Sequence, residues 1–78
     1  MARKQKSADE LQEELNRVAM RLSADGEGRF IEFELPVPAE AETNPLGHNW
    51  DVTVHCPEGL EEIATNAVIE VAERRDLD

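Results

Sequence analysis

Cysteine is nearly absent from this chain of 78 residues, which contains Cys56 alone. A single cysteine cannot form a disulfide within the chain, so the sequence predicts a reducing, cytoplasmic environment. Aromatic residues are also scarce: there is no Tyr, and Phe30, Phe33 and Trp50 are the only three. Aliphatic side chains must therefore fill most of the core, and oligomerisation commonly stabilises a core this small.

Long hydrophobic runs and basic residues are lacking as well. No apolar stretch approaches the roughly 20 residues that span a bilayer, which argues against a membrane protein. The formal net charge is −10, and from Ser7 onward five arginines face all eighteen acidic residues. Such a body repels phosphates, which argues against direct nucleic-acid binding, and it favours a basic protein partner. An acidic surface that only keeps the protein soluble fits this charge equally well.

The distribution of cations and apolar residues predicts two regions. Residues 1–6 carry three cations without apolar periodicity, and they are predicted to form a flexible basic tail. Residues 7–78 are predicted to form a single domain. The last three residues of that domain are expected to fray.

Helices are predicted on both sides of the chain's centre. Ser7 and Glu10 have the spacing of a capping box, and apolar residues then recur every three or four positions. This pattern predicts a helix over 8–23. Pro57 suits the first turn of a second helix, and a broad apolar face extends that helix to Arg74.

Strands are predicted between the two helices. Residues 49–56 alternate, with Trp50 and Cys56 facing the core, and residues 29–35 place Ile31, Phe33 and Leu35 on one face. The intervening residues 36–48 are rich in proline and predict a loop. We therefore expect an α+β fold, a two-layer α-β-β-α arrangement with both helices on one face of a two-stranded antiparallel sheet. Because open strand edges favour pairing, a homodimer with a four-stranded sheet or a helix-mediated homodimer is also expected.

Residues able to carry catalysis are few. His48, His55 and Cys56 have no spacing typical of a metal site, and no glycine-rich phosphate loop occurs. Cys56 precedes a predicted helix, where a thiol is activated, but its strand phase places it toward the core as a filler. The sequence therefore predicts no catalytic residue, no metal, no cofactor and no enzymatic activity, with an enzyme built around Cys56 as the least favoured alternative.

The acidic outer face of the predicted sheet is the candidate binding site. Its residues Glu32, Glu34 and Asp51, with Glu61 and Glu62 at the start of the second helix, are predicted to bind a basic surface of a partner. In size and charge alone, the chain is similar to the small acidic inhibitors of phages, such as anti-CRISPR and anti-restriction DNA mimics. An inhibitor that occludes a nucleic-acid-binding site is therefore the leading hypothesis, and a small dimeric structural or assembly subunit is the alternative.

Overall fold

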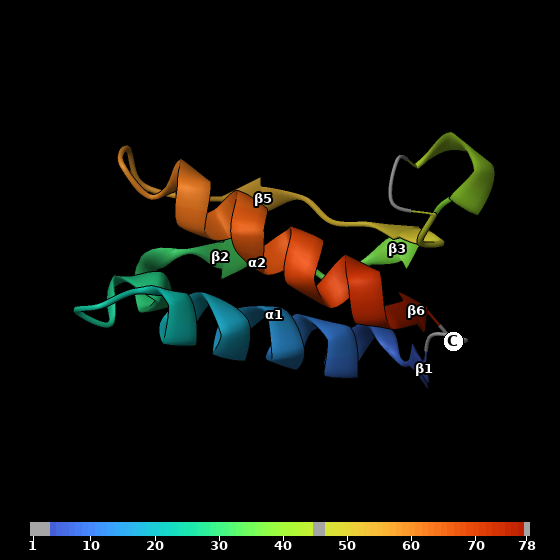
Figure 1. Ribbon diagram of the computed structural model, residues 1–78, viewed down its shortest axis with the longest axis horizontal. Helices are drawn as coiled ribbons and strands as arrows, with labels where there is room; N and C mark the ends of the chain where they lie inside the picture. Colours follow the sequence, from blue (N-terminus) through green and yellow to red (C-terminus); the bar gives the residue numbers. More distant parts are fainter. Residues whose placement is uncertain (1–3, 45–46, 78) are drawn as a thin grey trace.

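The computed structural model describes residues 4–44 and 47–77, and within them the chain belongs to the mixed α+β class, as predicted. The two helices, α1 (Ala8–Leu22) and α2 (Glu61–Arg74), pack against each other (Figure 1). The remaining elements are short: β1 (Lys4–Lys6), η1 (Glu27–Phe30), β2 (Glu32–Phe33), β3 (Val37–Pro38), η2 (Ala41–Thr43), β4 (Trp50–Asp51), β5 (Val54–His55) and β6 (Arg75–Leu77).

Helix α1 begins as its sequence predicts. The Glu10 N–H donates to Ser7 Oγ at 3.2 Å, and the Ser7 N–H donates to Glu10 Oε1 at 3.0 Å. This capping box satisfies N–H groups that have no partner inside the helix. The apolar stripe that follows, from Leu11 to Ala19, is buried against the rest of the core.

Helix α2 begins at Glu61, four residues later than predicted. The Leu60 N–H donates to the Pro57 carbonyl at 3.2 Å, which closes a turn ahead of the helix. Gly59 in that turn has a φ of +96°, in the left-handed region that a right-handed helix cannot contain. Residues 57–60 therefore form a turn, while the predicted end at Arg74 is confirmed.

The two central strand segments form one antiparallel ribbon that is interrupted by a bulge. β2 pairs with β5, and β3 pairs with β4. Between the two ladders the Glu34 N–H donates to the Thr53 carbonyl at 3.0 Å, so Leu35 and Pro36 together lie opposite Val52. Two residues facing one define a β-bulge, and Pro36 has no N–H to contribute there.

The bulge changes which side chains face the core. Pro36 is buried, whereas Leu35 is 50% exposed. The prediction that Leu35 shares the inner face with Ile31 and Phe33 is therefore wrong, because the extra residue reverses the alternation. The ladder also resumes at Val37, inside the segment predicted to be a loop.

The ends of the chain are paired rather than frayed. β1 lies parallel to β6, with Lys4 opposite Arg75 and Lys6 opposite Leu77. The predicted flexible tail is therefore wrong for 4–6, and predicted fraying is wrong for 76–77, because backbone hydrogen bonds hold both segments. Residues 1–3 and 78 of these predictions lie outside the described residues.

Residue Asn49 joins this pair of end strands to the central ribbon. Its side-chain oxygen accepts a hydrogen bond from the Leu77 N–H at 2.6 Å, and its side-chain nitrogen donates to the Leu77 carbonyl at 3.0 Å. Beside it, Trp50 Nε1 donates to the Arg75 carbonyl at 3.1 Å. Trp50 is fully buried, so the core is continuous from the helices to β6.

We expect Asn49→Ala to lower the free energy of unfolding by about 2 kcal/mol, because two hydrogen bonds to Leu77 are lost. Asn66→Ala, at an exposed position on α2, is the matched control and should change stability by less than about 0.5 kcal/mol. Urea unfolding followed by circular dichroism measures both values. Equal midpoints for Asn49→Ala and the unchanged protein would contradict this role.

Candidate protein-binding surface

The face of the ribbon turned away from the core gathers the predicted acidic residues of the strands. We call this surface the outer face and define it by Glu32, Glu34, Asp51, Thr53 and His55, all of which are exposed. Glu32 pairs with His55 across the ladder, and Glu34 bonds to Thr53. Asp51 lies two residues before Thr53 and so points to the same side of the strand.

Within the outer face, Glu34 and His55 form a direct contact. A carboxylate oxygen of Glu34 meets His55 Nε2, and both side chains are more than half exposed. The hydrogen bond to Glu34 is the main cause that raises the pKa of His55 above its usual value, and the negative charges of Glu34 and Glu32 act in the same direction. This contact leaves the other carboxylates of the face unpaired by any described cation.

The remaining two predicted site residues lie on another element. Glu61 and Glu62 are exposed in the first turn of α2, and a Glu61 carboxylate oxygen accepts the Gly59 N–H at 2.8 Å. No hydrogen bond or ion pair among residues 4–44 and 47–77 connects them to the outer face. The five predicted residues thus form two acidic groups.

A stronger charge signal lies in the order of residues along the chain. No Lys or Arg occurs between Arg29 and Arg74, and this interval contains ten acidic residues: Glu32, Glu34, Glu40, Glu42, Asp51, Glu58, Glu61, Glu62, Glu70 and Glu73. The eight cations elsewhere are matched by eight acids, so residues 30–73 account for the whole net charge of −10. The net charge summed from Ser7 onward does not reveal this separation of acidic residues from cations along the chain.

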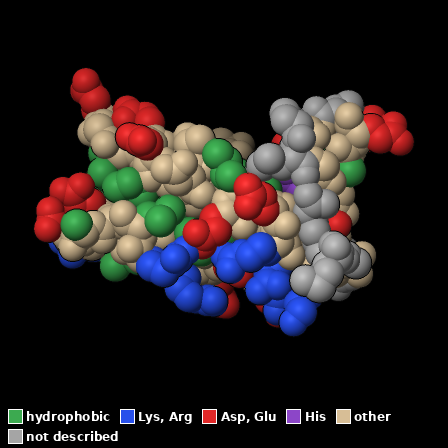
Figure 2. All heavy atoms as spheres, viewed as in Figure 1, with side chains coloured by type: hydrophobic (Ala, Val, Ile, Leu, Met, Phe, Trp, Pro, Cys, Tyr) green, Lys and Arg blue, Asp and Glu red, His purple; other side chains and the backbone are tan. Residues whose placement is uncertain are grey.

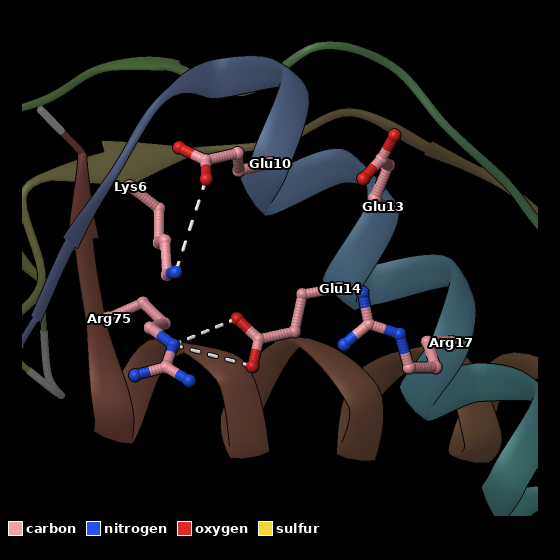
Figure 3. A pocket seen from close by; sticks show the side chains of 6 residues that line it. All are labelled: Lys6, Glu10, Glu13, Glu14, Arg17 and Arg75. Carbon is pink, nitrogen blue, oxygen red and sulfur yellow. Dashed lines mark hydrogen bonds and ion pairs between the residues drawn. The ribbon is translucent and has the colours of Figure 1, made fainter.

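Most of the described cations gather on α1 and near the chain ends, and Arg29 lies on η1 (Figure 2). Figure 3 shows Arg75 directed at Glu14, a buried residue of α1, and its Nε lies 3.0 Å and 3.3 Å from the two carboxylate oxygens. Lys6 pairs with Glu10, and Arg21 and Arg74 both contact Glu70. Because acidic groups accompany these cations, this side of the molecule is a mixed-charge network.

An apolar hollow of about 300 Å³ lies between β5 and α2. We call it the β5–α2 groove; it is lined by Val54, Cys56, Glu61, Ala64, Thr65, Val68 and Ile69. Cys56 is partly buried and packs against the core, in agreement with its predicted phase, and its thiol is free. Strand and helix periodicity did not predict the groove, because its width depends on how the turn at residues 57–60 places α2 beside β5.

The histidines and the cysteine are not assembled into a metal site. His48 is buried and packs edge-on against Trp50, with ring centroids 4.8 Å apart, while His55 is exposed on the outer face. Among the described residues, no three His, Cys, Asp or Glu side chains are grouped closely enough to hold a metal ion. No helix in the described part of the chain has the length and apolar character needed to cross a membrane.

We expect Glu34→Gln to lower the pKa of His55 toward its usual value of about 6.5, because the hydrogen-bonding carboxylate is removed. Glu32→Gln is the matched control and should lower the pKa less, since Glu32 acts on His55 only through its charge. Following the His55 ring signals by NMR across the pH range measures both values.

The contact between Glu34 and His55 also contributes to the free energy of unfolding, and the direction of its pH dependence can be predicted. A histidine pKa raised by folding stabilises the protein fully below the unfolded value, and this contribution disappears as pH rises through the folded pKa. The stability difference between the unchanged protein and Glu34→Gln should therefore shrink between acidic and alkaline pH. A pKa of His55 that is the same in both proteins would contradict the assignment.

Comparisons with protein-family models, with curated proteins and with solved structures find no match to this chain.

Proposed function

We propose that this chain is a non-enzymatic, cytoplasmic protein that binds a basic surface of a partner protein. The observation that carries the proposal is the absence of any cation between Arg29 and Arg74, where ten acidic residues occur. A surface with one sign of charge steers an oppositely charged partner toward it, and this attraction is stronger at low salt. The outer face supplies the exposed carboxylates of Glu32, Glu34 and Asp51 for this contact.

The proposal includes a two-layer arrangement of the α-β-β-α part. Ile31, Phe33 and Trp50 of the ribbon are buried in the same core as the apolar stripes of α1 and α2. With one side of the ribbon covered in this way, the outer face is the side that remains available to a partner. This arrangement supports the use of the outer face rather than the helices.

The partner we propose is a nucleic-acid-binding protein whose phosphate-binding site becomes occluded. Such sites are rich in Lys and Arg because they neutralise phosphates. Glu32 and Glu34 lie on the same side of one strand, about 6.6 Å apart along it, and therefore present a regular row of negative charge. An inhibitor of the anti-CRISPR or anti-restriction type would act in this way.

We expect the triple variant Glu32→Lys, Glu34→Lys, Asp51→Lys to lose the basic partner captured from a host lysate at low salt, because attraction becomes repulsion. The matched control is Glu13→Lys, Asp25→Lys, Glu27→Lys, which makes the same charge change at exposed positions outside residues 30–73. The control should keep the partner, and duplex DNA should displace it from the unchanged protein. Retention of the partner by the outer-face variant, or binding unaffected by salt, would refute the proposal.

A second candidate function is a small dimeric structural or assembly subunit that associates through its helices. The observation that favours it is the presence of large hydrophobic side chains on both helices that are more than a third exposed, namely Met20, Leu22 and Ile69. Isolated exposed apolar residues are common, so the proposal depends on their acting together.

We expect that, if this second function holds, Met20→Glu combined with Ile69→Glu dissociates the dimer without unfolding the chain, because buried charge opposes the contact. Analytical ultracentrifugation with circular dichroism measures both properties. A monomer in the unchanged protein at high micromolar concentration would eliminate the dimeric subunit.

A further inference from the structure

One edge of the central ribbon is open. β5 hydrogen-bonds to β2 through the backbones of Thr53 and His55, so the N–H and C=O groups of Val52, Val54 and Cys56 point away from β2. Beyond the ladder, the described hydrogen bonds do not involve these outward groups. Unpaired groups along a strand edge form a template for another strand.

On the opposite edge of the ribbon, a side chain of α1 occupies one outward carbonyl. The Gln12 side-chain nitrogen donates to the Phe33 carbonyl at 2.8 Å, and Phe33 is the residue that lies opposite Val54 in the ladder. A helix side chain thus covers the outward carbonyl on the β2 side. Within the described part of this ribbon, the β5 side is therefore the edge better placed to accept a new strand.

The β5–α2 groove lies directly along the open edge. Val54 and Cys56 form one wall, and Ala64, Val68 and Ile69 of α2 are the apolar part of the other. Side chains of an added strand alternate between the two faces of a sheet. One row of them would enter this apolar groove, and the other row would lie over the outer face.

The carboxylates around the two rows are joined on the outer face by the titratable ring of His55, which contacts Glu34. Among the residues that the structure describes, Glu61 is the only charged one that lines the groove, and Glu32 and Glu34 stand on the outer face one strand away from the open edge. A second copy of the chain would bring a further set of the same carboxylates to this site, since residues 30–73 contain no Lys or Arg. Long basic side chains on the added strand would instead reach the carboxylates of this chain.

We propose that the open edge of β5 accepts an extended segment of the basic partner, which adds as a strand with apolar side chains in the β5–α2 groove and Lys or Arg side chains over the outer face. Backbone hydrogen bonds to Val52, Val54 and Cys56 supply the affinity of such strand addition, and the two rows of side chains supply its specificity. This inference rests on the proposed function and names the form in which the partner is recognised.

The test uses the whole chain and synthetic peptides of about seven residues, the length of an ordinary strand. One peptide alternates lysine and valine, a second alternates glutamine and valine, and a third is the lysine peptide with N-methylated valines, which cannot form the ladder. Binding is measured by fluorescence anisotropy at about 50 mM and about 500 mM salt. Hydrogen exchange of the Val54 amide, followed by NMR, reports strand addition directly.

Two variants of α2 provide a matched pair. Thr65 lines the groove and Asn66 does not, both are exposed, and each has a glutamate four residues earlier, Glu61 and Glu62 respectively. Thr65→Lys should weaken binding of the lysine peptide about ten-fold or more, because a long charged side chain then occupies the apolar groove that the valines would enter. Asn66→Lys adds the same charge beside the groove and should change the affinity by less than about two-fold.

The lysine peptide is expected to bind, to protect the Val54 amide and to weaken at high salt, while the N-methylated peptide does not bind. Salt-sensitive binding without protection of Val54 overturns strand addition and leaves the proposed function intact. Equal binding of the glutamine peptide at both salt concentrations supports strand addition and overturns the basic partner. Absence of any peptide binding overturns the inference, as does a dimer of the unchanged protein that Thr65→Lys dissociates.

Discussion

The pairing of Arg75 with Glu14 is the contact on which the arrangement of the other elements depends. The carboxylate of Glu14 is buried on α1, and the guanidinium belongs to Arg75, the first residue of β6. Breaking a buried ion pair costs more than the pair contributes, because the remaining charge loses its partner. The Arg75 carbonyl accepts the hydrogen bond of Trp50, so α1, the central ribbon and the C-terminal strand meet at one residue. The ribbon that carries the acidic outer face is consequently attached at its β4 end to β6 and, through β6, to α1.

Local patterns predicted the parts of the fold that are determined by neighbouring residues. The capping box at Ser7, the apolar stripe of α1 and the alternation around Trp50 all involve residues within a few positions of one another. The bulge at Leu35 was not predictable in this way. Proline marks an interruption of a ladder, but whether pairing resumes beyond it depends on the opposite strand.

The candidate site was predictable to a similar extent. Strand alternation correctly predicted that Glu32, Glu34 and Asp51 are exposed, because a half-buried strand leaves alternate side chains outside. The grouping of Glu61 with them was not supported by any described contact, since α2 begins beyond a turn. The pairing of β1 with β6 had no local signal, because each strand is short and polar and about 70 residues separate them.

The separation of charge along the chain also makes the charge distribution of the molecule asymmetric. Residues 30–73 hold the entire net charge, while residues 1–29 and 74–78 together are balanced, so the negative charge is unevenly distributed over the molecule. In the field of a positively charged body, such a molecule experiences a torque as well as an attraction. It would rotate during approach so that the part formed by residues 30–73 leads. The two molecules would then be oriented before their surfaces touch, and a larger fraction of their collisions would lead to binding.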